Sequence, residues 1–244
     1  MSTRLACVVF DAARPRRVAR FWAELLGWEI TLDRPDQVDV AASDPDAPDI
    51  ALSFLPARTL GAGKNRIHLD LASRSLDHQG VQVDRALSLG ARRVDIGQGA
   101  VPWAVLADPE DNEFCVLEPR EEYVDTGAIA AIVVDTRDPS RLAAFWSTAS
   151  GWPITHEHNR YTGIRSATAQ GPWLEFLRAQ DDPKDPGHLH LDLVPFPADD
   201  PAREIERLCA AGARTSRPAD SPTAPITLAD PETYEFRLLR PHRD

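Results

Sequence analysis

The chain has 244 residues, 43% of them hydrophobic, which is enough apolar material for one large domain or two of ordinary size. Its net charge of −11 excludes a nucleic-acid-binding surface, because phosphate contacts need clustered Lys and Arg and no basic stripe is present. The first residues lack a long apolar run, so we expect no signal peptide and no membrane span, and we predict a cytoplasmic protein.

The first half of the chain alternates short strands with two helices. A helix is predicted from about residue 15 to 26, ending at Gly27, and a second helix ends at Gly90. The apolar stripe of the first helix consists of Val18, Phe21, Trp22 and Leu25. Strands are predicted over residues 51–55, 66–71, 104–107 and 113–117.

The second half shows the same succession. Its first helix begins with Asp138 as N-cap and Pro139 at the first helical position, and ends before Gly151. A second helix ends at Gly212 and is expected to turn Ile205, Leu208 and Cys209 inward. Strands are predicted over residues 173–177, 188–193, 226–229 and 235–239.

The two halves are copies of one sequence. The segment RIHLDL around His68 recurs as HLHLDL around His190, and LADPEDNEF recurs as LADPETYEF at the same spacing. A repeat of this length is a whole domain, and the charged stretch at 121–127 marks the boundary. We therefore predict an α+β protein with two domains, residues 1–122 and 123–244, in which the order βαβββ repeats and each copy builds its own cleft.

Strand alternation separates a helix-facing side from a polar side in each copy. Ile67, Leu69 and Leu71 should pack against helices, which turns His68 and Asp70 to the opposite side. The same alternation places eight further residues on this side, or in its vicinity, as candidate ligand contacts: Ser53, Trp103, Cys115, Trp173, Glu175, His190, Asp192 and Arg237. A strongly curved sheet would make this side the wall of a pocket.

These motifs resemble a known superfamily, the vicinal oxygen chelate proteins. The superfamily includes glyoxalase I, extradiol dioxygenases, methylmalonyl-CoA epimerase and the bleomycin-resistance binding proteins. The resemblance rests on FWAELLG, on the HLDL strand and on ADPEDNEF, which together span nearly the whole chain twice and look most like the glyoxalase-like domain subgroup. It implies βαβββ modules curved around a cleft with helices outside. In the metal enzymes it implies one divalent ion with four ligands from the first and last strands of two modules.

The ligand set carried over from this resemblance is incomplete. In the first copy the matching positions are the region 4–7, Ser53, His68 and Cys115, of which His68 alone is a usual ligand type. In the second copy they are the region 128–131, Glu175, His190 and Arg237. Glu175 and His190 match, but the guanidinium of Arg237 would repel a cation. We therefore predict no resident metal and no cofactor, and the second copy is the place for a divalent ion if one is bound.

Several of these residues also have a purely structural interpretation. His68 and His190 are equally explained as histidines hydrogen-bonded to Asp70, to Asp192 or to the backbone. Cys115 is expected to be a small buried hydrophobe, and Trp22 and Trp146 to be core residues. The ADPE segments should form tight turns.

Two functions remain open from the sequence. The first is a metal-free binding protein that sequesters a small aromatic or amphipathic metabolite, with Trp173 and Trp103 for stacking. The second is a superfamily enzyme, a lyase, isomerase or dioxygenase, in which His190 acts with Glu175 or Asp192 as acid and base, or in which the second copy holds an ion. The expected partner is a small molecule, and the duplication makes a monomer plausible beside a homodimer.

Overall fold

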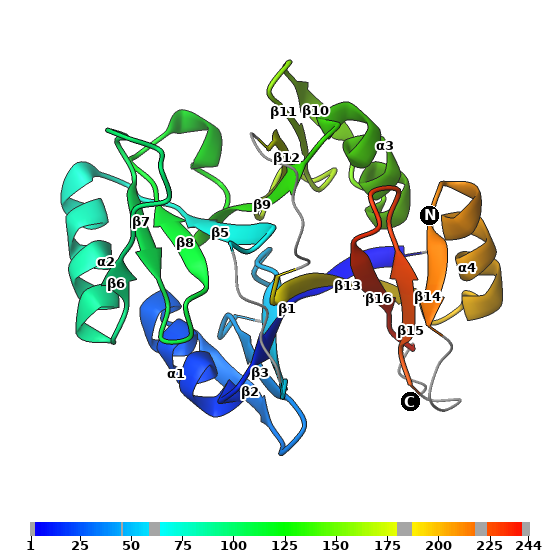
Figure 1. The fold of residues 1–244 in the computed structure, drawn as a ribbon, viewed down its shortest axis with the longest axis horizontal. Coiled ribbons are helices and arrows are strands. Elements are labelled where there is room, and N and C mark those ends of the chain that lie inside the picture. Colours follow the sequence, from blue (N-terminus) through cyan, green and yellow to red (C-terminus); the bar gives the residue numbers. More distant parts are fainter. Residues whose placement is uncertain (1–2, 45, 59–63, 180–186, 218–223, 241–244) are drawn as a thin grey trace.

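The computed structural model describes residues 3–44, 46–58, 64–179, 187–217 and 224–240, which form two eight-stranded mixed sheets and four α-helices (Figure 1). The first copy contains β1 (Thr3–Ala12), α1 (Pro15–Leu26), β2 (Glu29–Asp33), β3 (Val38–Ala41), β4 (Ala51–Pro56), β5 (Ile67–Leu71), α2 (Leu76–Ser88), β6 (Arg92–Arg93), β7 (Ala104–Ala107) and β8 (Glu113–Val116). The short 3-10 helix η1 (Glu121–Tyr123) lies between the copies. The second copy contains β9 (Ile129–Thr136), α3 (Pro139–Ser150), β10 (Ile154–Glu157), β11 (Tyr161–Ile164), β12 (Trp173–Arg178), β13 (Leu189–Pro195), α4 (Pro201–Ala210), β14 (Arg214–Arg217), β15 (Ile226–Ala229) and β16 (Glu235–Leu238). The predicted α+β class and tandem arrangement are confirmed.

Each sheet combines one half of the first copy with one half of the second. Sheet A has the strand order β14-β15-β16-β13-β1-β4-β3-β2, and sheet B has the order β10-β11-β12-β9-β5-β8-β7-β6. The joins are antiparallel pairs, β1 with β13 and β5 with β9, and Figure 1 shows β1 beside β13 although they come from opposite ends of the chain. The expectation that each copy builds its own cleft is therefore wrong. An exposed strand edge is a site for pairing, and here the first module of each copy pairs with the second module of the other copy.

Helix ends follow the sequence signals. The side chain of Asp138 accepts a hydrogen bond from the amide of Arg141, Pro139 opens α3, and Gly151 ends it in the left-handed region at φ 75°. α1 covers the predicted residues, and Gly27 ends it at φ 70°. In α4, Leu208 is fully buried, whereas Ile205 and Cys209 are only half-buried. The helices are therefore placed by local signals, with tertiary packing setting how deeply each face is buried. Among the described residues no helix is long and apolar enough to cross a membrane.

The ADPE turns connect the two sheets. Asp108 accepts hydrogen bonds from the amides of Glu110 and Asn112, which confirms the predicted tight turn between β7 and β8. Beyond that prediction, the Glu110 carboxylate accepts from the amides of Ala13 and Arg14, at 2.7 and 2.8 Å, just before α1. A turn of sheet B thus stabilises the start of the helix that follows the first strand of sheet A.

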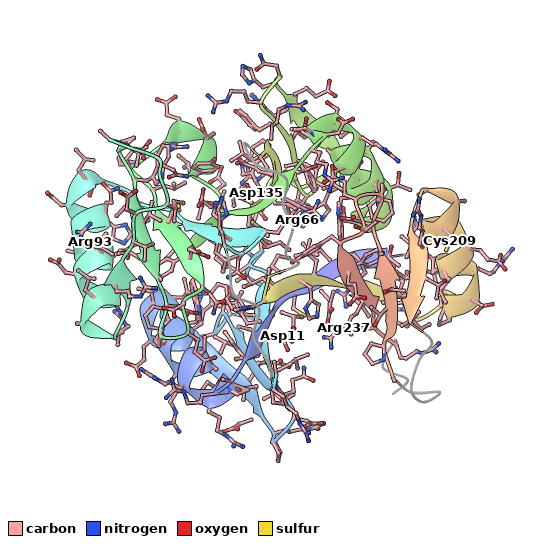
Figure 2. The ribbon with its side chains drawn as sticks, viewed as in Figure 1. Asp11, Arg66, Arg93, Asp135, Cys209 and Arg237 are labelled. Carbon is pink, nitrogen blue, oxygen red and sulfur yellow. The ribbon has the colours of Figure 1, made fainter. Side chains whose placement is uncertain are left out.

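The second copy repeats this connection with one addition. Glu232 accepts from the amide of Asp138, at 3.0 Å, at the start of α3, and it also pairs with Arg66 at 2.5 Å. Both charged side chains of that pair are at most 9% exposed. Arg66 in turn donates to the carbonyl of Asp135, and Figure 2 shows both residues near the middle of the molecule.

One hydrophobic core runs through both sheets, and the tryptophans of α1 and α3 lie in it. The Trp22 ring contacts Phe114 of β8 at a centroid distance of 5.0 Å, and the Trp146 ring contacts Phe236 of β16 at 5.2 Å. Trp22 and Trp146 are therefore core residues, as predicted. Strand alternation is confirmed as well, because the Leu, Ile and Phe residues predicted to face inward are buried: Leu52, Phe54, Ile67, Leu69, Leu71, Phe114, Leu174, Phe176, Leu189, Leu191, Leu193 and Phe236.

Candidate functional site

The polar face of sheet A consists of Cys7, Ser53, His190, Asp192 and Arg237, which come from four strands and from both copies. In the strand register, Asp192 lies opposite Cys7 on one side and Arg237 on the other. Val9 lies between Ser53 and His190. Residues paired in register project from the same face of a sheet, so these side chains form two neighbouring rows.

A two-point ion pair occupies one of these rows. The Arg237 Nε atom lies 2.9 Å from Asp192 Oδ1, and Nη2 also contacts Oδ2. Asp192 is almost fully buried, and the Arg237 side chain is 22% exposed. Burial raises the pKa of Asp192, while its bonds to Arg237 act in the opposite direction. The Cys7 thiol lies 3.8 Å from the same carboxylate, and burial raises its pKa well above its usual value. Cys7 is therefore a protonated thiol.

Two further carboxylates extend this face. Asp39 lies opposite Ser53 in the register, and its two oxygens accept from Gln37 Nε2 at 2.9 Å. Asp11 follows Val9 by two residues, and Figure 2 shows it on the same side of sheet A as Arg237. Burial raises the pKa of Asp11, and the charge of Arg237 lowers it. The face therefore carries three carboxyl groups and one guanidinium.

Neither His190 nor His68 makes a hydrogen bond to the neighbouring acid, which is one of the structural interpretations open from the sequence. His190 Nε2 lies 3.7 Å from Asp192 Oδ1, and His68 Nε2 lies 3.6 Å from Asp70 Oδ1, both longer than a hydrogen bond. Burial and the charge of Arg237 lower the pKa of His190 to about 3. Burial lowers the pKa of His68 to about 4. Both imidazoles are neutral at pH 7.

The polar face of sheet B consists of His68, Asp70, Cys115, Trp173 and Glu175. Asp70 lies beside Cys115 in the register, and His68 shares a row with Glu175 across one intervening strand, β9. His68, Asp70 and Cys115 each offer a ligand atom within 4.8 Å of the others. Sheet B thus collects the acids, thiol and imidazole that the sequence predicts, taken from both copies.

Two carboxyl groups on this face titrate near neutral pH. Burial raises the pKa of Glu175 to about 7, although a hydrogen bond from Tyr123 lowers it. Burial and the charge of Glu175 raise the pKa of Asp70 to about 7. Burial and the charge of Asp70 raise the pKa of the Cys115 thiol, which is 5% exposed. Cys115 is therefore an inert, protonated thiol, in agreement with its interpretation as a small hydrophobe.

The linker between the copies, residues 118–127, covers this face. Tyr123 Oη donates to Glu175 Oε1 at 3.0 Å, and its ring packs in a small cluster with Cys115 and Ala130. Trp173 Nε1 donates to the carbonyl of Glu122 at 3.2 Å. Tyr123 is 9% exposed, so the linker fills space that an open face would offer to a ligand.

The two tryptophans predicted to line a pocket are engaged by the protein itself. Trp103 Nε1 donates to Gln98 at 2.9 Å, and the Arg120 guanidinium lies 5.5 Å from the Trp103 ring centroid. Arg165 lies 5.3 Å from the Trp173 centroid. Both rings therefore stack on arginine side chains beside sheet B, and neither belongs to the polar face of sheet A.

The positions that match metal ligands fall into different groups when they are assigned to sheets instead of to copies. Sheet A brings together Cys7, Ser53, His190 and Arg237. Because Arg237 is a fixed cation within that set and already binds Asp192, a divalent ion does not fit there.

On sheet B the same positions are Ala131, Glu175, His68 and Cys115. Ala131 offers no ligand atom, and Tyr123 holds Glu175, so the four-ligand set of the metal enzymes does not fit here either. Within the described residues, three His, Cys, Asp or Glu ligand atoms come together only at His68, Asp70 and Cys115. Binding there would first have to displace the thiol proton.

The predicted pairing of Glu175 with His190 is wrong. Glu175 lies on β12 of sheet B and His190 on β13 of sheet A, because the two halves of the second copy join different sheets. Sequence reasoning also missed Tyr123, Asp11 and Asp39. The alternation that selected His68 would have selected Asp11 and Asp39 on their strands, whereas Tyr123 lies in the segment interpreted only as a boundary.

Comparison with known proteins gives a consistent assignment of the fold. The family model described as "Glyoxalase-like domain" matches residues 7–117 and 131–239. A search of curated proteins gives no match. Among solved structures, the V278E mutant of glyoxalase I from Zea mays is 16% identical, with a TM-score of 0.72, covering 98% of this chain and 92% of that one. A putative dioxygenase from Bacillus subtilis subsp. subtilis str. 168 is 14% identical, with a TM-score of 0.60, covering 97% and 84%. At these identities the likeness concerns the fold alone.

Proposed function

This chain belongs to the glyoxalase-like domain family, and from that premise we propose that it binds a small amphipathic metabolite with a cationic group on the polar face of sheet A, without a divalent metal. The observation that carries the proposal is the buried ion pair of Arg237 with Asp192. It places a fixed cation among the positions that metal enzymes use for ligands. Binding or sequestration, as in the bleomycin-resistance proteins that the sequence resembles, needs no metal.

The charge of the face supports a cationic group on the ligand. Asp11, Asp39 and Asp192 oppose the single guanidinium of Arg237, so the formal charge is negative. A ligand cation beside Asp39 of β3 lies four strands from Arg237 of β16, which disfavours an ion at the metal-ligand positions, and it gains Coulomb energy from the carboxylates in a partly desolvated environment.

Hydrogen-bonding capacity on the same face supports a polar ligand. Ser53 is 2% exposed, and neither its Oγ atom nor His190 Nε2 has a hydrogen-bond partner among the described residues. They flank Val9, whose buried apolar side chain lies between them. Buried polar groups are usually satisfied, and a bound molecule with matching groups would satisfy both after small side-chain rotations. Because Trp103 and Trp173 lie beside sheet B, stacking by these rings is no part of this site.

A titration with the aromatic cation thioflavin T tests the site. We expect saturable binding to the full chain, and Asp11→Asn should weaken it about fivefold by removing one carboxylate. Asp84→Asn makes the same charge change on the exposed side of α2 and serves as the matched control. Equal affinities of Asp11→Asn and the wild-type protein for thioflavin T would contradict the proposal.

Metal content provides an independent test. Elemental mass spectrometry of the purified protein should give far less than one ion per chain, and Mn, Fe, Co, Ni and Zn ions should leave the melting temperature unchanged. A stoichiometric ion that is lost in His68→Ala but kept in His78→Ala would contradict metal-free binding and assign the ion to sheet B.

A second candidate function rests on the pair of Glu175 and Tyr123, in which Tyr123 Oη donates to Glu175 Oε1 at 3.0 Å and burial raises the pKa of Glu175 to about 7. A carboxyl group with this pKa can accept and return a proton at neutral pH, as lyases and isomerases require. Proton exchange of small α-hydroxy ketones in D2O, followed by NMR, should be catalysed by the wild-type protein and fall about a hundredfold in Glu175→Gln. No exchange above the buffer rate would remove this candidate.

A further inference from the structure

A cavity of about 970 Å3 lies between the C-terminal end of α1, the first turns of α2 and the linker. Ligand cavities in proteins commonly measure about 300–1,000 Å3, so this space accepts a molecule of drug size. Its lining residues differ from those of the polar faces of sheets A and B, although Tyr123, which covers Glu175 on sheet B, is also among them. The cavity is therefore a separate place to look for a ligand.

Exposed apolar side chains line the cavity from two sides. Val81 of α2 is 64% exposed and Val124 of the linker is 74% exposed, so two of the six exposed large hydrophobic side chains among the described residues lie at this one cavity. Leu25 and Leu26 at the end of α1 add a third apolar wall. Clustered exposed apolar side chains around a concavity are typical of a binding site.

The charge of the lining is opposite to that of the protein. Three arginines, Arg74, Arg85 and Arg120, line the cavity together with one acid, Glu121, in a chain of net charge −11. Arg85 is held in place by a hydrogen bond to the carbonyl of Glu24. Arg120 pairs with Glu118 at 2.7 Å, which leaves Arg74 and Arg85 as the main sources of positive potential. An anion entering this cavity is attracted, whereas most of the surface repels it.

One buried polar group in the wall points to the same kind of ligand. Ser73 is 8% exposed, and its hydroxyl has no hydrogen-bond partner among the described residues. It precedes Arg74 in the chain and also lines the cavity. A hydroxyl donor next to a guanidinium is suited to an oxyanion such as a carboxylate, sulfonate or phosphate.

We infer that this cavity binds a small amphipathic anion, with the apolar body against Val81 and Val124 and the anionic group toward Arg74 and Arg85. The site is independent of the proposed function on sheet A, and it selects a ligand of the opposite charge.

Fluorescence titration of the full chain with anilinonaphthalene sulfonate tests this site. The wild-type protein should bind one dye molecule saturably, and Arg74→Glu should weaken binding about tenfold by reversing a charge in the wall. Arg93→Glu makes the same change at an exposed position of β6 outside the cavity and should leave the affinity within about twofold. Val81→Asp should weaken both this dye and its uncharged analogue N-phenylnaphthylamine, whereas Arg74→Glu should leave the uncharged analogue unchanged.

Thermal unfolding followed by circular dichroism checks that each variant is folded. An equal loss of dye affinity in Arg74→Glu and Arg93→Glu would overturn the inference, and so would dye binding that does not saturate. Unchanged dye binding in Asp11→Asn shows that this site and the one on sheet A are distinct, so either can fail without the other.

Discussion

The polar faces of sheets A and B lie on equivalent strands, but the equivalent carboxyl group has a different neighbour on each. On sheet A, Asp192 is bound by Arg237 of the last strand. On sheet B, Asp70 has Cys115 at the position of Arg237, and the pKa of Asp70 rises to about 7. The neighbouring strand thus supplies a guanidinium that opposes the burial-driven rise in the pKa of Asp192, whereas burial and Glu175 raise the pKa of Asp70 without such a partner.

The faces also differ in what lies over them. The linker crosses sheet B and places Tyr123 on Glu175. On sheet A, Arg237 and His190 keep 22% and 17% of their side chains exposed. Duplication therefore produced two similar frameworks, of which the linker covers the one on sheet B.

The largest expected effect is the loss of the ion pair on sheet A. Arg237→Met leaves the Asp192 carboxylate buried without its partner, which should lower the free energy of unfolding by about 3 kcal/mol in urea denaturation at pH 7. The matched change on sheet B is Asp70→Asn, which removes a buried acid that has no such partner and should be neutral or stabilising. Equal destabilisation by the two variants would break the comparison.

The pH dependence of the free energy of unfolding should be set by the two buried carboxyl groups of sheet B. Asp70 and Glu175 have pKa values of about 7 in the folded protein, against 3.8 and 4.5 for their unperturbed groups. The folded state therefore binds more protons between these limits. The stabilisation is complete below about pH 4 and is lost as the pH rises through 7. We expect the free energy of unfolding to fall by on the order of 2.5 kcal/mol between pH 6 and pH 8.

The double variant Asp70→Asn, Glu175→Gln should flatten that pH profile, whereas Asp84→Asn should leave it unchanged. A profile that keeps its slope in the double variant would show that other groups cause it. Denaturant midpoints measured at half-unit pH intervals give the comparison.

The smallest effect concerns the linker. Tyr123→Phe removes the donor to Glu175 but keeps the ring in its cluster, so stability should fall by about 1 kcal/mol at pH 8 and by less at pH 5. The loss is larger at the higher pH because the ionised carboxylate is the stronger acceptor. A Phe variant as stable as the wild-type protein at both pH values would mean that the linker is held by its other contacts alone.

Much of the local structure was predictable. The bounds of α1 and α3 follow from Pro15, Pro139 and the glycines behind them, because a helix start and stop depend on a few neighbouring residues. The sides on which His68, Glu175 and Arg237 lie follow from alternation, since a strand turns successive side chains to opposite faces.

The composition of each site was not predictable in this way. Grouping the candidates by copy put Glu175 with His190, whereas the sheets put Glu175 with His68 and Cys115. The two modules of each copy carry similar strands, so the hydrophobic pattern permits pairing within a copy or between copies. The contact of Tyr123 with Glu175 was also not predictable, because a linker segment shows no periodicity that would place its side chains on a particular surface.

The sequence by itself determined the duplication, the succession of helices and strands, and the face to which each polar side chain turns, because all of these depend on contacts within a few residues or on direct self-similarity. Only the tertiary structure decided which polar side chains meet. β1 joins β13 and β5 joins β9 across the copies, and this choice depends on long-range strand pairing and on a core shared by both sheets. Arg237 thereby comes to share a face with Ser53 of the other copy, and Tyr123 comes to cover Glu175.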